Sequence, residues 1–177
     1  MNLPNKLTIA RMIAVPFFIA AYLLGYFPVA LVIFIAASIT DYFDGKIARS
    51  QNLVTNFGKI MDPLADKILV YSALCLFIES EIIRAWMLIL ILAREFIVAG
   101  MRTVAASEGT VLAAGMSGKI KTVLQMVAVI VFLFSLCLDN GRDTVMMAGN
   151  VIFWASLVMT VYSGCEYVLK NRSVFSM

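Results

Sequence analysis

Long apolar runs alternate along the chain with short polar breaks at 25–28, 50–58, 79–84, 107–118 and 139–144. A helix of about 20 apolar residues crosses the hydrocarbon core of a bilayer, and several of the runs reach that length. The pattern therefore predicts six membrane-spanning helices. Their expected ranges are 8–26, 28–50, 59–79, 83–106, 118–138 and 144–169.

Composition supports the same interpretation. Of the 177 residues, 62% are hydrophobic and 14% are charged, and the mean hydropathy is +0.95. A chain of this size cannot bury so much apolar surface in one water-soluble core. No break is long enough to be a linker, so we predict an all-α fold: a polytopic membrane protein whose six transmembrane helices form a single domain over residues 1–177.

The positions of the cations predict the orientation of the bundle. Lys and Arg gather on the cytoplasmic side of membrane proteins. With six spans, both termini and the second and fourth breaks lie on one side of the membrane, and of the 14 Lys and Arg residues only Arg84 and Arg142 lie on the other. We therefore expect a multi-pass protein of the plasma membrane with both termini in the cytoplasm.

The residue types that are missing restrict the chemistry. The chain has no histidine, which excludes Ser-His and Cys-His nucleophilic catalysis and histidine acid–base catalysis. Its three cysteines have no CxxC spacing, so neither a disulfide framework nor a zinc site is indicated. A net charge of +3 is too small to indicate nucleic-acid binding. Catalysis must therefore use carboxylates, cations or a metal ion.

Four aspartates lie inside the second and third expected helices: Asp41, Asp44, Asp62 and Asp66. An aspartate near the centre of a spanning helix costs about 2.5–3.5 kcal/mol, so these side chains need a compensating interaction. Each pair lies on one helix face, and the short connection makes the two helices antiparallel neighbours, so the pairs can meet. Four converging carboxylates predict an all-oxygen site for two Mg²⁺ or Mn²⁺ ions.

Two other interpretations of the aspartates compete with a metal site. They can form a structural charge network with neighbouring cations, or line the cation path of a transporter. Transport predicts polar residues that continue to the far side of the membrane, whereas those of this chain stop on one side. A purely structural membrane subunit is disfavoured by the cost of placing four carboxylates there. The cations available for a structural network are Lys46, Arg49, Lys59 and Lys67.

Small residues extend the aspartate pattern to Asp41-x-x-Asp44-Gly45-x-x-Ala48-Arg49, eight further residues, and Gly58-x-x-x-Asp62-x-x-x-Asp66. This pattern resembles the complete signature of the CDP-alcohol phosphotransferases. The resemblance implies transfer of a phosphatidyl-type group from a CDP-linked donor to an alcohol, with release of CMP. It also implies that the four aspartates hold two divalent ions and that Asp66 is the general base.

The resemblance implies a donor site as well. Small side chains allow the CDP-diacylglycerol donor to approach the backbone, and polar ones can hydrogen-bond it. By the same resemblance, residues at the amino-terminal end line the donor or acceptor site; the alternative is a capped, basic amphipathic start of the first helix. The implied donor-binding residues are Gly45, Ala48, Arg49, Thr55, Gly58, Asn5 and Thr8.

Cations outside the signature predict an acceptor that carries a phosphate. Arg94 lies inside the fourth expected helix, where a buried arginine needs a partner or an anion, and Glu95 is one such partner. Lys119 and Lys121 differ by about 200° around their helix and cannot both point inward; either can instead extend toward lipid headgroups. The residues predicted to bind the acceptor phosphate are Arg11, Arg94, Arg102, Lys119 and Lys121.

Three segments, NLPNKLTIAR, REFIVAGMR and GKIKTVLQ, resemble most the bacterial members of the family that use sn-glycerol 3-phosphate as acceptor and form phosphatidylglycerophosphate. Other acceptors within the family are phosphatidylglycerol, inositol phosphate and serine, of which the extra cations favour those with a phosphate. The resemblance also implies a homodimer in the lipid bilayer.

The substitution Asp62→Asn separates an enzyme from a transporter. We expect the variant to fold but to lose metal-dependent release of CMP, because a neutral amide is a much weaker ligand for a divalent ion than a carboxylate. CMP release by the purified protein is the measurement, with Asp139→Asn, outside the expected helices, as the control. Unchanged release by Asp62→Asn contradicts the enzyme hypothesis.

Overall fold

The computed structural model describes the backbone of residues 3–50, 56–110, 112–113 and 115–172, and side chains within these ranges except those of 3–6, 41–50, 56–60, 62–63 and 66. This part of the chain forms helices and no strand, as predicted. The six helices are α1 (Leu3–Leu23), α2 (Phe27–Ser50), α3 (Asn56–Glu79), α4 (Ala85–Ser107), α5 (Met116–Leu136) and α6 (Arg142–Lys170).

Each helix coincides with one range expected from the sequence, with differences of a few residues at the ends. The largest difference is at α1, which begins at Leu3 rather than at residue 8. The apolar run begins only after Lys6, but Asn and Lys are compatible with helical backbone, so the helix extends beyond its apolar part. Hydropathy therefore predicts the apolar length of a helix better than its ends.

Three of the helices end in the same hydrogen-bonded motif. After α1, Gly25 has φ +78°, and the N–H of Tyr26 donates to the carbonyl of Ala21 at 2.9 Å. The chain repeats this arrangement after α4 at Gly109 and after α3 at Glu81, a non-glycine residue with φ +58°. A residue in the left-handed region after a helix satisfies the last carbonyls and turns the chain back.

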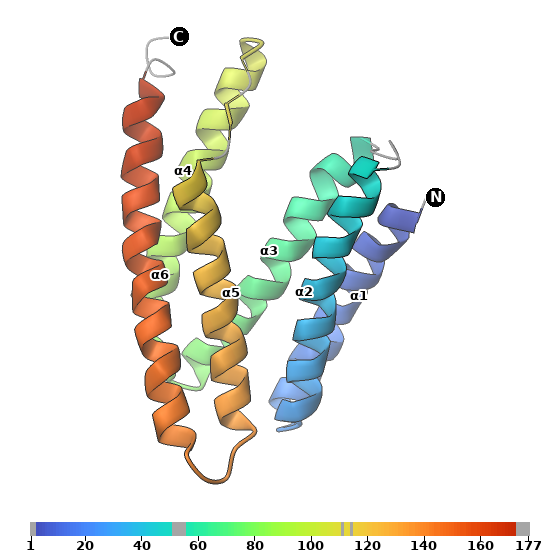
Figure 1. Cartoon of the computed structure of the whole chain (residues 1–177), viewed down its shortest axis with the longest axis vertical. Coiled ribbons are helices and arrows are strands. Elements are labelled where there is room, and N and C mark those ends of the chain that lie inside the picture. The colour runs from blue at the N-terminus through green and yellow to red at the C-terminus, as the bar shows by residue number, and fades with distance from the viewer. Residues whose placement is uncertain (1–2, 51–55, 111, 114, 173–177) are drawn as a thin grey trace.

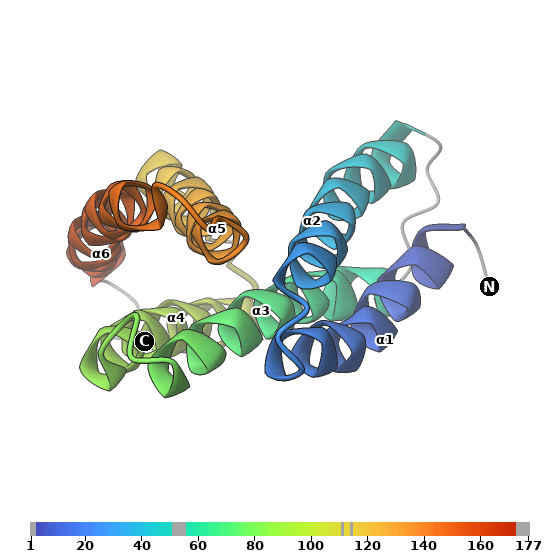
Figure 2. The same ribbon diagram turned by 90° about the horizontal axis from the view of Figure 1, so that it is seen from below.

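The helices form two groups that meet through an aromatic core. Figures 1 and 2 show α1, α2 and α3 on one side and α4, α5 and α6 on the other; α5 packs along α6 and also contacts α2. Phe77 of α3 contacts Phe132 of α5 with ring centroids 5.3 Å apart, and Phe132 contacts Phe153 of α6 at 5.9 Å. These three rings are buried and join the two groups.

One end of the molecule carries the start of α1, the end of α2, the start of α3 and the ends of α4 and α6 (Figure 1). The helices thus alternate in direction, and the two ends of the described chain lie on the same side, as expected for six antiparallel helices. We call this side the cation-rich end because Arg102, Lys119, Lys170 and Arg172 lie there. Arg84 and Arg142 lie at the opposite end.

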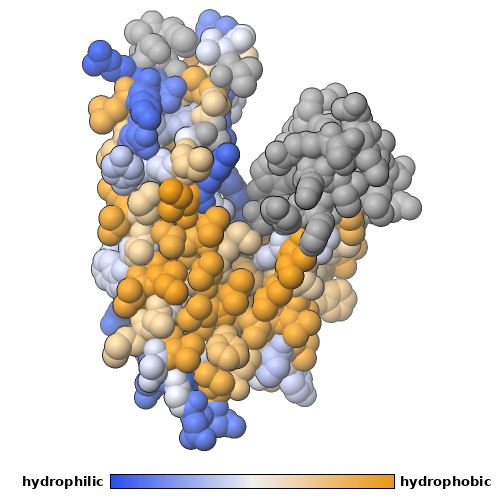
Figure 3. Space-filling view, in the orientation of Figure 1, coloured by the Kyte–Doolittle hydropathy of each residue, from blue (hydrophilic) through white to orange (hydrophobic). Residues whose placement is uncertain are grey.

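On the face shown in Figure 3, apolar side chains cover the middle of the molecule, and polar side chains gather toward the described parts of its two ends. Phe96, Ile89 and Val158, for example, are 71%, 65% and 65% exposed. Within the described residues, α5 and α6 are long and apolar enough to cross a membrane, and α1 and α2 contain shorter apolar stretches. Soluble proteins do not expose apolar surface on this scale, so these features are those of a membrane protein.

The positive φ of Glu81, after α3, predicts backbone strain that a substitution by glycine can test. Glu81→Gly is expected to raise the free energy of unfolding by about 1 kcal/mol, because the strain of a side chain at positive φ exceeds the entropy cost of glycine. Gly25→Ala is the reverse change. A Cβ at Gly25 meets no atom within 4 Å, so its expected loss of about 1 kcal/mol is purely conformational. Equilibrium unfolding in detergent measures the free energy of unfolding of both variants. If Glu81→Gly is no more stable than the wild type, Glu81 is not strained.

Candidate active site

The signature residues lie on the last turns of α2 and the first turns of α3. Both segments are at the cation-rich end of the molecule (Figure 1). The approach of the two aspartate pairs stays a prediction, because their side chains lie outside the described residues. Within the described part, α1 contacts α2 and α3 more extensively than these two contact each other. In Figure 2, α2 rises away from α1 and α3. The first helix is therefore the main support of both motif helices.

The side chains of most signature residues lie outside the described part of the structure, so their metal and donor roles stay predictions. Among the side chains that are described, no group of three His, Cys, Asp or Glu residues is placed to hold a metal ion. The predicted residues outside the described set are Asp41, Asp44, Asp62, Asp66, Gly45, Ala48, Arg49, Thr55, Gly58 and Asn5.

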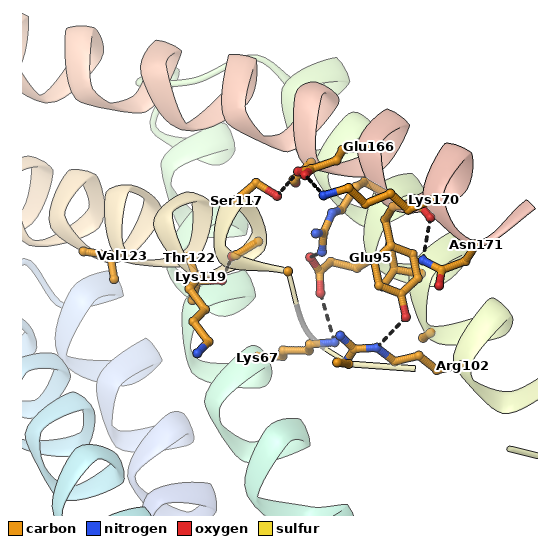
Figure 4. A pocket seen from close by; sticks show the side chains of 18 residues that line it. Lys67, Glu95, Arg102, Ser117, Lys119, Thr122, Val123, Glu166, Lys170 and Asn171 are labelled. Atoms are coloured by element: carbon orange, nitrogen blue, oxygen red, sulfur yellow. Dashed lines mark hydrogen bonds and ion pairs between the residues drawn. The ribbon is translucent and has the colours of Figure 1, made fainter. Parts of the chain in front are cut away.

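A cavity of about 810 Å³ lies at the cation-rich end, between α3, α4, α5 and α6 (Figure 4). Among the residues that the structure describes, five cationic side chains line it, against two carboxylates, and this excess of positive charge favours an anionic ligand. The cations are Lys67, Arg94, Arg102, Lys119 and Lys170, and the carboxylates are Glu95 and Glu166.

Three cations from three helices share the carboxylate of Glu95. Its Oε1 accepts from Nζ of Lys121 at 2.6 Å and from a terminal guanidinium nitrogen of Arg94 at 2.8 Å, and its Oε2 lies 3.0 Å from Nζ of Lys67. Lys121 is only 3% exposed, and an unpaired charge in such a position is strongly destabilising. The expectation that Glu95 pairs with one of the cations is confirmed and extended to three.

Arg94 is held between two glycines. A Cβ at Gly118 of α5 lies 3.0 Å from a terminal nitrogen of the guanidinium, and a Cβ at Gly164 of α6 lies 3.0 Å from its Cγ. Both positions are too close for an alanine without movement of the arginine. The Nε of Arg94 is buried and has no hydrogen-bond partner among the described residues. Buried donors without a partner are rare in proteins, so the surroundings of Arg94 are unusual among the described side chains.

The other predicted acceptor residues are divided between the cavity and its surroundings. Arg102 lines the cavity, and its Nε donates to the hydroxyl of Tyr167 at 3.1 Å. Lys119 also lines it and points away from Glu95 (Figure 4), whereas Lys121 lies beneath the wall in its ion pair. The prediction that the two lysines face different ways is confirmed. Arg11 is buried in α1, outside the cavity lining.

Glu166 and its two hydrogen-bond partners form a part of the cavity wall that the sequence did not predict. Glu166 of α6 accepts hydrogen bonds from the hydroxyl of Ser117 and from Nζ of Lys170 (Figure 4). An ionised pair four residues apart in an apolar helix is a recognisable signal, and Glu166 with Lys170 is such a pair. The contact of Ser117, 49 residues away, has no counterpart in local sequence.

Comparison with known proteins decides the family. The family model for CDP-alcohol phosphatidyltransferases matches residues 1–162. The chain belongs to the CDP-alcohol phosphatidyltransferase family. It is thus a member of the family whose signature its two motif helices resemble, and the cavity described above is a feature of a phosphatidyltransferase.

Relatives of known name cover almost the whole chain. A CDP-diacylglycerol–glycerol-3-phosphate 3-phosphatidyltransferase of Bacillus subtilis is 43% identical, over 96% of this chain and 95% of its own. Proteins of the same name from Rickettsia felis and Escherichia coli K12 are 37% and 35% identical, over 98% and 97% of this chain and 97% and 96% of their own.

Proposed function

We propose that the chain transfers the phosphatidyl group of CDP-diacylglycerol to sn-glycerol 3-phosphate, giving phosphatidylglycerophosphate and CMP. The relatives with that reaction in their name are 35–43% identical over nearly the full chain. The observation that carries the proposal for this chain's own residues is the cationic cavity, which lies at the same end as the signature aspartates. Donor and acceptor sites are thus assigned to neighbouring parts of one molecule.

On the donor side, the four aspartates of the signature would hold two divalent ions, Mg²⁺ or Mn²⁺. The donor set fits: it consists of carboxylates, and the chain has no histidine, so hard cations are favoured over zinc or copper. When bound, such ions neutralise the diphosphate and the departing CMP. Gly45, Ala48 and Gly58 leave room for the donor, which Arg49, Thr55, Asn5 and Thr8 would hydrogen-bond.

Asp66 would orient the attacking hydroxyl of the acceptor and accept its proton. A carboxylate near cations is a weak base, so alignment of the hydroxyl is the larger part of this role. The nucleophile is the hydroxyl at the end of glycerol opposite the phosphate. Anchoring the phosphate in the cavity therefore turns the hydroxyl away from it, and Lys67, next to Asp66, places the cavity wall and the base on the same helix.

On the acceptor side, the phosphate would be bound by Arg94, Arg102 and Lys119, with Lys121 beneath them. A phosphomonoester carries about −1.5 to −2 charge at pH 7, which suits a cavity whose described lining has five cations and two carboxylates. Serine has no such anion, and phosphatidylglycerol carries a single negative charge in a diester. The charge balance therefore supports glycerol 3-phosphate or inositol phosphate, and the relatives support the former. The predicted contact of Arg11 with the acceptor phosphate is not supported by this cavity, because Arg11 does not line it.

All six helices would span the plasma membrane, with both termini and the active site at its cytoplasmic face. The cation-rich end supports this orientation because Lys and Arg are enriched in cytoplasmic segments. Water-soluble glycerol 3-phosphate and CMP would then exchange with the cytoplasm, while the donor arrives from the bilayer. We further propose one domain over residues 1–177, and a homodimer as its assembled form.

Purified protein supplied with labelled CDP-diacylglycerol and one acceptor at a time tests the reaction. We expect labelled phosphatidylglycerophosphate with glycerol 3-phosphate, and no phosphatidyl product with phosphatidylglycerol, inositol phosphate or serine. Product formation is followed by lipid chromatography and CMP release, with and without a metal chelator. A product with another acceptor in preference to glycerol 3-phosphate overturns the assignment.

Arg102→Gln tests the cavity itself. A hydrogen bond to a charged group contributes about 1.5–3 kcal/mol, so its loss is expected to raise the KM for glycerol 3-phosphate roughly 10- to 100-fold. The KM for CDP-diacylglycerol is expected to stay unchanged. Arg84→Gln makes the same chemical change at an exposed residue at the opposite end of the molecule. If both variants have the KM of the wild type, the cavity is not the acceptor site.

A further inference from the structure

Glu95 is the point at which three helices are connected by charge. It lies on α4, and its partners Lys67 and Lys121 come from α3 and α5. Its side chain is 11% exposed and that of Lys121 is 4% exposed, whereas that of Lys67 is 44% exposed. The carboxylate therefore extends from the buried side of the cavity wall to the cavity surface.

The ion pair with Lys67 crosses a region where helices diverge. Figure 1 shows α3 and α4 moving apart from their connection at 80–84 toward the cation-rich end. Lys67 directly follows Asp66 in the chain, and its Nζ lies 3.0 Å from Glu95. The pair thus connects α3, which carries two of the four signature aspartates, to α4, which carries Arg94 and Arg102.

The contact with Arg94 sets the direction of a guanidinium. One terminal nitrogen of Arg94 donates to Glu95 at 2.8 Å, and Gly118 and Gly164 enclose the rest of the side chain. With one nitrogen bound and both flanks in contact, the plane of the guanidinium has little freedom. Its Nε, which is buried and has no hydrogen-bond partner among the described residues, is therefore held in one orientation.

We infer that Glu95 is a positioning residue for the transfer reaction: it orients Arg94 toward the acceptor phosphate and, through Lys67, holds the α3 segment with Asp66 against the acceptor cavity. The inference rests on the proposed function. Glu95 itself does not contact the reacting atoms; it acts through two residues, one for each substrate side. A purely structural role, in which Glu95 only neutralises the buried Lys121, is the competing explanation.

Glu95→Gln and Glu95→Asp distinguish these roles. In Glu95→Gln we expect the KM for glycerol 3-phosphate to rise at least 10-fold and kcat to fall at least 10-fold, with the KM for CDP-diacylglycerol within about 2-fold of the wild type. Glu95→Asp keeps the charge and is expected to recover part of both losses. Glu108→Gln, an exposed glutamate just after α4, is the matched control.

Two variants keep the test valid if Glu95→Gln does not fold. Lys67→Met removes only the connection to α3 and is expected to lower kcat with little change in the KM for glycerol 3-phosphate; Arg94→Lys is expected to raise that KM. A Glu95→Gln enzyme that is less heat-stable but has wild-type KM and kcat overturns the inference, as does a Lys67→Met enzyme with wild-type kcat. The wild type is assayed alongside: if it does not use glycerol 3-phosphate, the proposed function fails, and the variants are compared with the acceptor that it does use.

Discussion

A charged side chain buried in an apolar helical bundle is stable only when it is paired with an opposite charge. Glu95 is the clearest example, because it pairs with three cations. Lys121 is almost completely buried, and Arg94 has only a small exposed fraction. Removal of one member of such a group leaves the others with an uncompensated charge. The four side chains therefore determine how α3, α4 and α5 lie relative to one another near the cavity, and the rest of the candidate site is arranged around them.

The charge that remains after this pairing has a functional consequence. Three cations on one carboxylate leave two positive charges, to which Arg102 and Lys119 add at the cavity surface. Four aspartates lie on the neighbouring motif helices. The proposed donor and acceptor sites would thus carry opposite charges, which suits a reaction in which cations bound by carboxylates hold one phosphate-bearing substrate and cationic side chains hold the other.

Packing elsewhere in the molecule supports this arrangement without charge. Phe77, Phe132 and Phe153 join the two groups of helices below the site. A Cβ at Gly149 would lie 2.8 Å from the ring of Phe132, so α5 and α6 approach closely only because α6 has no side chain there. Gly118 and Gly164 likewise leave room for the side chain of Arg94, which a Cβ at either position would approach to 3.0 Å. Small residues thus bring the helices together both in the core and at the cavity.

The amino-acid sequence by itself determined the six helices, their alternation and the side on which the cations gather, because apolar length and charge position are properties of a linear pattern. It also contained the signature of the family and the separation of Lys119 from Lys121 around their helix. Only the tertiary structure decided that Glu95 joins Lys67, Arg94 and Lys121, that glycines of α5 and α6 enclose Arg94, and that Arg11 lies outside the cavity. Helical periodicity states which residues share a face, but not which face of another helix they meet. That choice depends on the packing of the whole bundle, to which residues far apart in the chain contribute together.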